Sequence, residues 1–465
     1  MRVTFLGAAR TVTGSQHLVG VNGHKILLDC GLYQGRQEQA YERNSHFEFD
    51  PKELEAVILT HAHIDHSGNL PTLVKQGYQG PIYATHVTAH LAEVMLQDAG
   101  HIQEEDVEYL NQKRKGRGQK PVQPLYTRQD AEEAARLFEK MEYDKPFEAA
   151  PGVTVRLVDA GHILGSAAVV LDAEEQGGLK RLWYSGDIGR LNLPLVNDPV
   201  LPQDAEALIM ECTYGDRSHT PPEEAYEALR KALVRTLERG GKVVIPAFAV
   251  GRTQELVYDI NQMLENGEIP EAPVYVDSPL AVEVSKIFHE HPQYFDREAK
   301  EFILSDKNHS ALTFDRLTYV QSVQESRELN DQEGPMVIIS ASGMAESGRI
   351  LHHLIHTIGF EKNAILIVSY QAPDTLGRDL EEGATEVEIF GDIFYRKAEV
   401  MRIHGFSAHA GKNFLFEYGK AVKGQAKQVF LVHGEEQAAE ALRKRLQEAG
   451  LEKVYYPYLH QSMEI

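Results

Sequence analysis

The sequence predicts an α/β protein in two parts, a sheet sandwich flanked by helices with a parallel-sheet unit inserted into it. Short apolar segments, broken by glycine and polar turns, fill roughly the first 210 residues, and helical patterns stand between some of them. From about residue 216, long helical patterns alternate with strongly apolar segments, which is typical of a parallel sheet covered on both faces. Short strand patterns return after about residue 398.

The first part is predicted from many short strands with helices between them, which indicates a layered sandwich. The expected strands are residues 3–6, 25–28, 56–59, 153–158 and 181–184, and the expected helices are residues 85–110 and 130–141. The inserted unit is predicted from helices at 222–239, 252–265 and from 350, and from strands at 243–246, 274–276, 336–340 and 364–368. Strands at 399–403 and 428–432 and a helix at 435–449 follow. We therefore expect residues 1–215 and 398–465 to form one domain and residues 216–397 an inserted domain.

Length and composition limit the classes of protein to which this chain can belong. A chain of 465 residues exceeds what one hydrophobic core usually supports, and 42% apolar residues allow two packed units. The net charge of -22 argues against a general electrostatic grip on nucleic acid, although a basic groove on one face stays compatible with it. Only Cys30 and Cys212 are present, so we expect no disulfide framework and a cytoplasmic protein. No segment has the pattern of a secretory signal or a membrane span.

The strongest local signal is residues 61–66, HAHIDH, directly after the apolar strand. Four ligand side chains in six residues, His61, His63, Asp65 and His66, would point into one pocket at a strand end. Imidazole and carboxylate together suit zinc, with manganese or iron as alternatives. The alternative is a polar loop with no metal-binding role. Four potential ligands within six residues make this alternative less favoured.

Further ligand candidates lie elsewhere in the first part. Asp29, His162 and Asp187 each stand close to glycine near the end of an apolar segment, where the backbone can approach a site. Taken singly, each is a weak signal, because an Asp after a strand is most often a turn or cap residue.

In order and spacing, Asp29, the 61–66 motif, His162 and Asp187 resemble the signature motifs of the metallo-β-lactamase fold, an αββα sandwich with metals at the edge of its two sheets. The resemblance implies a first metal held by His61, His63 and His162, and a second held by Asp65 and His66. It implies that Asp187 bridges the two metals. Asp29 would orient the ligands and the metal-bound water.

Three later motifs resemble those of the β-CASP nucleases, a group that contains the pre-mRNA 3′-end cleavage subunit, ribonuclease J and short stand-alone bacterial and archaeal RNases. They are ECTYG at 211–215, GFSAH at 405–409 and LVHGE at 431–435. The inserted unit resembles the family at 246–255 and 340–344. The resemblance therefore covers essentially the whole chain, and implies a metallo-β-lactamase sandwich with an inserted β-CASP domain.

By this resemblance, His433 completes the second metal site and His409 is a general acid positioned by Glu211. A histidine at the position of His433 accompanies RNA cleavage in the family. The implied activity is a ribonuclease with two zinc ions, or manganese, a bridging hydroxide nucleophile and a histidine general acid, leaving 5′-phosphate and 3′-hydroxyl ends. Endonucleolytic cleavage is favoured over 5′-to-3′ exonucleolytic cleavage, and single-stranded RNA and a second copy of the chain are the expected partners.

Phosphate contacts are expected from the inserted unit, at Ser340, Ser342, Gly343 and Arg252. The segment 340–343 follows an apolar strand and offers N–H groups and hydroxyls to an anion, although a plain β-to-α turn has the same pattern. Arg252 could pair with phosphate or with a carboxylate. The basic run 113–120 reads by default as a solvated loop, with contact to an RNA backbone as the alternative.

Two other functions stay open at this point. A metallo-β-lactamase-fold hydrolase of a small ester or thioester would not need the inserted unit with Glu211, His409 and His433. A catalytically silent RNA-binding scaffold would be expected to lack metal ligands, whereas every ligand position is filled here.

Overall fold

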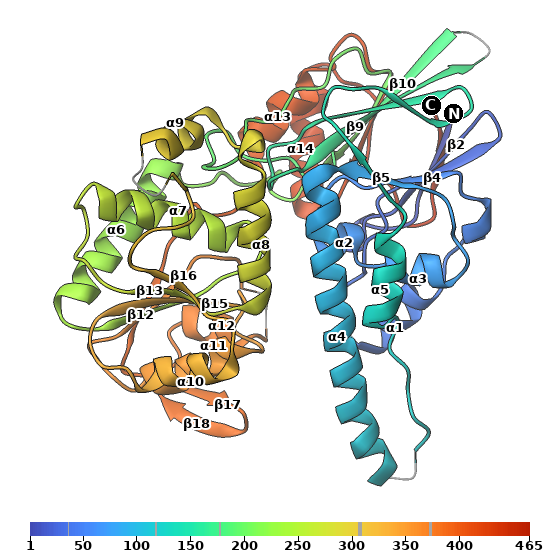
Figure 1. The fold of residues 1–465 in the computed structure, drawn as a ribbon. Helices are drawn as coiled ribbons and strands as arrows, with labels where there is room; N and C mark the ends of the chain where they lie inside the picture. Colours follow the sequence, from blue (N-terminus) through green and yellow to red (C-terminus); the bar gives the residue numbers. More distant parts are fainter. Residues whose placement is uncertain (36, 117–118, 176–177, 306–308, 372–373) are drawn as a thin grey trace. The chain divides into compact units, whose positions relative to one another are not determined.

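The computed structural model describes the whole chain except residues 36, 117–118, 176–177, 306–308 and 372–373. The described residues group into two units (Figure 1). The first unit comprises Met1–Leu191, Asn197–Ser218 and His409–Ile465, and the second comprises Asn192–Val196 and His219–Ala408. The chain therefore leaves the first unit, forms the second, and returns to complete the first.

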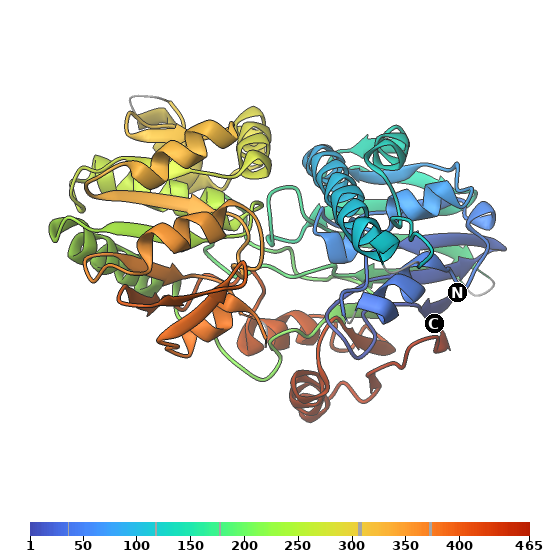
Figure 2. The same ribbon diagram turned by 90° about the horizontal axis from the view of Figure 1, so that it is seen from below.

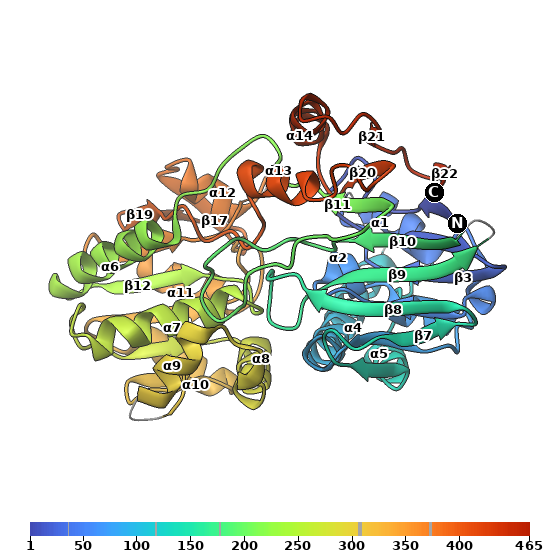
Figure 3. The ribbon, with the colours of Figure 1, turned by 90° about the horizontal axis from the view of Figure 1, so that it is seen from above.

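The first unit contains two seven-stranded sheets that share one core. The first sheet has the order β22 (Ser462–Glu464), β1 (Arg2–Phe5), β2 (His17–Val21), β3 (His24–Leu28), β4 (Ala56–Ile58), β5 (Ile82–Thr85) and β6 (Phe138–Met141). The second has the order β21 (Val454–Tyr455), β20 (Gln428–Val432), β11 (Ala207–Glu211), β10 (Gly178–Tyr184), β9 (Ala167–Glu175), β8 (Val153–Asp159) and β7 (Phe147–Ala150), of which β7 to β11 lie side by side in Figure 3. Fully buried Val3 and Ile58 of the first sheet belong to the same apolar cluster as Val169 and Phe430 of the second.

Helices cover the outer faces of both sheets. On the second sheet, α13 (Lys412–Lys420) and α14 (Glu436–Glu448) contribute to a second apolar cluster, in which the Trp183 indole donates a 2.8 Å hydrogen bond to the Tyr418 hydroxyl. On the first sheet, α4 (His86–Gly116) contacts β5 and β6 and packs along α5 (Arg128–Ala135). The remaining helices of this unit are α1 (Gln37–Ser45), α2 (Ile64–Ser67) and α3 (Leu70–Lys75). The predicted αββα sandwich is confirmed.

The second unit is built on a six-stranded sheet in which all strand pairs are parallel. Its order is β14 (Leu317–Tyr319), β13 (Val274–Val276), β15 (Met336–Ser340), β12 (Lys242–Pro246), β16 (Ala364–Ile367) and β19 (Glu399–Arg402). Helices lie on both faces of this sheet in Figures 1 and 2: α6 (Pro222–Glu238), α7 (Arg252–Glu265), α8 (Pro279–Glu290), α9 (Arg297–Ser305), α10 (Val323–Asp331), α11 (Arg349–Thr357) and α12 (Leu376–Glu381). A hairpin of β17 (Glu386–Ile389) and β18 (Asp392–Tyr395) stands apart from the sheet. The predicted all-parallel inserted sheet is confirmed.

Three local expectations differ from the structure. The helix expected at 130–141 ends at Ala135, because residues 138–141 form β6 against β5; Phe138 and Met141 have a spacing that also suits a helix. The strand expected at 399–403 joins the second unit's sheet, so the return to the first unit is at His409 and not near 398. The basic residues 113–115 form the last turn of α4 and no loop, while residues 117–118 lie outside the described part. Within the described residues, none of the helices is both long and apolar enough to cross a bilayer.

Candidate metal centre

The candidate ligands all follow the carboxyl ends of strands in the first unit. Asp29 follows β3 and the 61–66 segment follows its parallel neighbour β4. In the other sheet β10, β11 and β20 are parallel neighbours, and they are followed by Asp187, Thr213 and His433. Because parallel strands end at the same edge of a sheet, side chains distant in sequence meet here.

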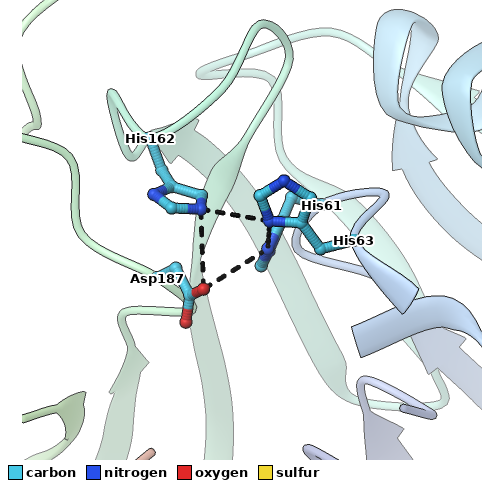
Figure 4. A group of neighbouring side chains, drawn as sticks. All are labelled: His61, His63, His162 and Asp187. Carbon is cyan, nitrogen blue, oxygen red and sulfur yellow. Dashed lines mark hydrogen bonds and ion pairs between the residues drawn. The ribbon is translucent and has the colours of Figure 1, made fainter. Parts of the chain in front are cut away.

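A first cluster consists of His61, His63, His162 and Asp187. Figure 4 shows the three imidazole rings and the carboxylate pointing toward one another. His63 Nδ1 lies 3.1 Å from His61 Nε2 and 3.2 Å from His162 Nε2. Asp187 Oδ2 lies 3.5 Å from His61 Nε2 and 3.6 Å from His162 Nε2. Three ring nitrogens and one carboxylate oxygen form a donor set that suits zinc.

A second cluster consists of Asp65, His66 and His433, and Asp187 also reaches it. His433 Nε2 lies 3.2 Å from Asp65 Oδ2, and His66 Nε2 lies 3.2 Å from Asp187 Oδ1. The two oxygens of Asp187 therefore face different clusters, Oδ2 the first and Oδ1 the second. Asp187 could bridge two ions, each surrounded by nitrogen and oxygen donors.

Asp29 is buried and both oxygens of its carboxylate are engaged in hydrogen-bonding contacts. Oδ1 accepts a 2.7 Å hydrogen bond from the Thr60 backbone N–H. Oδ2 lies 2.7 Å from His66 Nδ1 and accepts hydrogen bonds from the hydroxyls of Thr60 at 2.9 Å and Tyr184 at 2.7 Å. Because its oxygens are already engaged, Asp29 is suited to hold His66 in place and not to bind a metal itself.

The loop that carries His162 is hydrogen-bonded to the end of β5 and the start of α4. The hydroxyls of Thr85 and Thr88 donate to the Gly165 carbonyl at 2.7 and 2.8 Å. Gly165 has a φ of +83°, and a Cβ there would lie 2.6 Å from Val87 Cβ, so this turn requires glycine. The Ser166 hydroxyl accepts a 3.0 Å hydrogen bond from the His162 N–H. These contacts fix the backbone from which the imidazole reaches the cluster.

The electrostatics of the site keep His61, His162 and Asp187 in their metal-binding forms. Burial and neighbouring imidazoles lower the pKa of His61 and of His162 well below the ordinary value, so that these rings are neutral. Burial opposes ionisation of Asp187, but the surrounding histidines outweigh it and hold the pKa of this carboxyl well below its usual range. The largest of these contributions comes from His433. Neutral imidazoles and an ionised carboxylate are the forms that coordinate divalent ions. At His66, burial opposes the charged ring, but the Asp187 and Asp29 carboxylates outweigh burial and raise its pKa well above the ordinary value, so a metal would have to displace a proton from this ring.

His409 lies beside both clusters without belonging to the first. Its Nδ1 is 3.1 Å from Glu211 Oε1 and 3.8 Å from Asp187 Oδ2. Burial disfavours the charged ring, but the Glu211 and Asp187 carboxylates outweigh burial and raise the pKa of His409 to about 10. Glu211 is itself fully buried and accepts a 2.7 Å hydrogen bond from the Ile188 N–H through the same oxygen. The pair can supply a proton at one side of the centre.

The expected phosphate contacts all lie in the second unit. The Ser340 hydroxyl donates to the Asp277 carbonyl at 2.7 Å, and the Ser342 hydroxyl accepts from the Glu346 N–H at 3.2 Å. The Gly343 carbonyl accepts from the Gln371 amide at 3.0 Å. Arg252 pairs with the Glu255 carboxylate, the second of its two expected partners. A role of these residues toward phosphate stays a prediction.

The sequence reasoning missed two hydroxyls that touch ligands. Thr60 Oγ1 lies 3.1 Å from His61 Nδ1, and Thr213 Oγ1 lies 3.1 Å from His433 Nδ1. Thr60 precedes the HAHIDH motif and Thr213 is inside ECTYG, so adjacency to the motifs was the only available signal.

Comparison with known proteins agrees with the class of metal-dependent hydrolase that this fold and site define. Residues 10–247 match the metallo-beta-lactamase superfamily, residues 253–380 match the Beta-Casp domain, and residues 396–457 match the Zn-dependent metallo-hydrolase RNA specificity domain. The chain belongs to the β-CASP family of the metallo-β-lactamase superfamily.

Two curated relatives agree with this family, and a solved structure shares the fold. It is 39% identical over 452 residues to Ribonuclease TTHA0252 of Thermus thermophilus, covering 97% of each chain. It is 34% identical over 445 residues to Transcription termination factor FttA of Methanocaldococcus jannaschii, covering 94% of this chain and 67% of the relative. A solved structure of a protein of unknown function from Enterococcus faecalis has the same fold, with a TM-score of 0.58, 14% identity and 99% coverage of both chains.

Proposed function

We propose that this protein is a zinc-dependent ribonuclease that cleaves phosphodiester bonds of single-stranded RNA and leaves 5′-phosphate and 3′-hydroxyl ends. The observation that carries the proposal is Asp187, whose two carboxylate oxygens face two separate groups of ligand atoms. RNA is proposed as the substrate because the chain is similar to Ribonuclease TTHA0252 and because residues 396–457 match an RNA specificity domain. Endonucleolytic cleavage is the favoured mode.

The proposed ligands fall into two sets that share Asp187. The first ion would be held by His61, His63, His162 and Asp187, and the second by Asp65, His66, His433 and Asp187. The buried His66 Nε2 and Asp187 Oδ1 support this, because neither makes a hydrogen bond of good geometry within the described residues, and a cation would satisfy both. When bound, two divalent ions supply Lewis acidity that activates water and offsets the charge of the phosphate.

The remaining site residues have roles that follow from their contacts. Asp29 orients His66 through the hydrogen-bonding contact at Nδ1, which leaves Nε2 toward Asp187. Glu211 holds His409 by Nδ1, so the other ring nitrogen is available to protonate the leaving 3′ oxygen. His409 has 21% of its side chain exposed, whereas Glu211 is fully buried, so His409 is the member of the pair that can meet a substrate.

The inserted unit would contact the RNA backbone. Ser342 and the backbone at Gly343 stand where β15 ends, and hydroxyl and N–H groups at such a turn suit a phosphate. Ser340 donates to the Asp277 carbonyl and would act there through the geometry of the turn. Arg252, at the start of α7 and paired with Glu255, would be a separate phosphate contact. A homodimer is proposed from the family resemblance alone.

The test combines metal analysis with cleavage of linear and circular RNA. Wild-type protein should bind two zinc ions and cut both substrates to 5′-phosphate and 3′-hydroxyl ends. Asp187→Asn and His409→Gln should lose cleavage, while His101→Gln, a control on an exposed part of α4, should not. A circular RNA left intact would overturn the endonuclease mode, and undiminished cleavage by Asp187→Asn would overturn the proposed bridging role.

A further inference from the structure

We propose that Thr60 and Thr213 fix the tautomers of His61 and His433, so that each ring presents an unprotonated Nε2 to the metal centre. The inference rests on the proposed function for what the centre binds. It makes both threonines positioning residues that act through the histidines and touch no substrate. A hydroxyl group has a single hydrogen to donate and two lone pairs that accept.

The Thr213 hydroxyl lies within hydrogen-bond distance of two atoms of His433. Oγ1 lies 3.0 Å from the His433 carbonyl oxygen, which can only accept, and 3.1 Å from His433 Nδ1. If the hydroxyl donates to the carbonyl, a lone pair is left to accept a proton from Nδ1–H. A neutral imidazole carries one N–H, so Nε2 must then be unprotonated. Nε2 is the atom that lies 3.2 Å from Asp65 Oδ2, in the second cluster.

Thr60 has the same arrangement with a different acceptor. Its hydroxyl donates to Asp29 Oδ2 at 2.9 Å, and its Oγ1 lies 3.1 Å from His61 Nδ1. The carboxylate has no proton to give, so the hydroxyl again accepts from Nδ1–H and leaves Nε2 unprotonated. His61 Nε2 is the atom that faces His63 Nδ1 at 3.1 Å and Asp187 Oδ2 at 3.5 Å, in the first cluster. Each cluster thus has one histidine set by a threonine.

The opposite tautomer would place an excess of acceptors around each hydroxyl. With Nδ1 unprotonated, one hydroxyl hydrogen would be contested by the ring nitrogen and by the carbonyl or carboxylate oxygen. One of these acceptors would remain unsatisfied, at a cost of about 1–3 kcal/mol for a buried group. A proton on His433 Nε2 would meet Asp65 Oδ2 at 3.2 Å, so in metal-free protein this contact competes with the preference set by Thr213, whereas a proton on either Nε2 would have to leave before a metal could bind.

The test removes each hydroxyl without changing side-chain shape. Thr60→Val and Thr213→Val lose the acceptor, Thr60→Ser and Thr213→Ser keep it, and Thr72→Val is the matched control. Thr72 is buried in α3 and its hydroxyl has no hydrogen-bond partner in the described part of the chain. Zinc affinity is measured by competition with a chromophoric chelator, and tautomers are read from nitrogen shifts of ¹⁵N-histidine-labelled, metal-free wild-type protein.

Each valine variant should lose about 10- to 100-fold in affinity for one of the two zinc ions, as expected when a group that orients a metal ligand is removed. The serine variants and Thr72→Val should bind zinc as wild type does. Valine variants with unchanged affinity, or an unprotonated Nδ1 at His61 or His433 in the wild type, would overturn the inference. Wild-type protein that binds no zinc would instead defeat the proposed function, and the tautomers would still be read in that protein.

Discussion

Glu211→Gln changes the charge next to His409 while nearly preserving its shape. In the structure Glu211 Oε1 lies 3.1 Å from His409 Nδ1. Of the groups that raise the pKa of this ring to about 10, Glu211 contributes most. A unit charge at about 4 Å contributes roughly 4 kcal/mol at an effective dielectric constant of about 20. With about 1.36 kcal/mol for each pKa unit, the variant should lower the pKa of His409 by about 3 units in metal-free protein.

The expected consequence for cleavage has a definite sign. A general acid must be protonated, so the rate falls as pH rises through its pKa. Zinc, when bound, would offset the charge of Asp187 and lower the pKa of His409 in both proteins, and Glu211→Gln would lower it further. The alkaline limb of the pH–rate profile should therefore lie at lower pH in the variant than in the wild type.

Two measurements check this reasoning. Titration of ¹⁵N-labelled histidines in metal-free protein gives the pKa of His409, and single-turnover cleavage across pH gives the position of the alkaline limb. Glu206→Gln is the control, because Glu206 is a partly exposed carboxylate paired with Lys180 and Lys427, away from the cluster. Equal His409 titrations in wild type and Glu211→Gln would refute the electrostatic role of Glu211. A shifted titration with an unmoved alkaline limb would refute His409 as the acid.

Three further predictions concern stability. Asp277→Asn should destabilise the protein by about 3–5 kcal/mol in urea denaturation at neutral pH, because Asp277 is buried against Arg349 and His353, each at 2.6 Å. Burial opposes the charge, but these partners outweigh it and hold the pKa of Asp277 below its ordinary value. The ionised carboxylate therefore stabilises the folded protein above the unfolded pKa of Asp277. The difference in unfolding free energy between wild type and variant should shrink as pH falls through the folded pKa. Removing zinc with a chelator should lower Tm, by the equivalent of about 2.7 kcal/mol for zinc at 100 times its Kd; a Tm that does not respond to chelation and re-addition would contradict a folded-state metal site. Leu431→Ala in β20 should cost about 2–5 kcal/mol, whereas Leu179→Ala, at a position 52% exposed, should cost far less in the same assay.

The sequence predicted the parts of the site that depend on short spacing. His61, His63, Asp65 and His66 stand within six residues after a buried strand, so their convergence follows from local chain geometry. Asp187 was a weak candidate from its position next to glycine after a strand, but its bridging role and the part of His433 were predicted only through the family resemblance, because nothing in their own surroundings indicates which strands become neighbours. Hydroxyl partners such as Thr213 depend on side-chain rotamers and on a partner 220 residues away. Patterns of hydrophobicity do not carry that information.

The same limit explains two local differences, the sheet that residues 399–402 join and the strand found at 138–141 in place of a helix. Residues 399–402 form a short strand whose own sequence does not indicate its partner, and which sheet it joins is decided by β16, far from it in sequence. Residues 138–141 have apolar side chains at both ends, a spacing that a helix and a strand accommodate equally over so short a length. Pairing partners, and not local propensity, settled both cases.

The insertion of a second unit between β11 and β20 leaves the position of the metal ligands unchanged, because these two strands remain paired neighbours. Glu211 is paired with Val432 in parallel, and the Cys212 N–H donates to the Val432 carbonyl at 3.0 Å. The residues that follow, Thr213 and His433, are thus brought side by side by backbone hydrogen bonds that do not depend on what lies between them in sequence. A chain that leaves after one strand and returns on its neighbour keeps the ligand edge intact. Zinc affinity should therefore respond to substitutions in β11 and β20 and be insensitive to surface substitutions in the inserted unit.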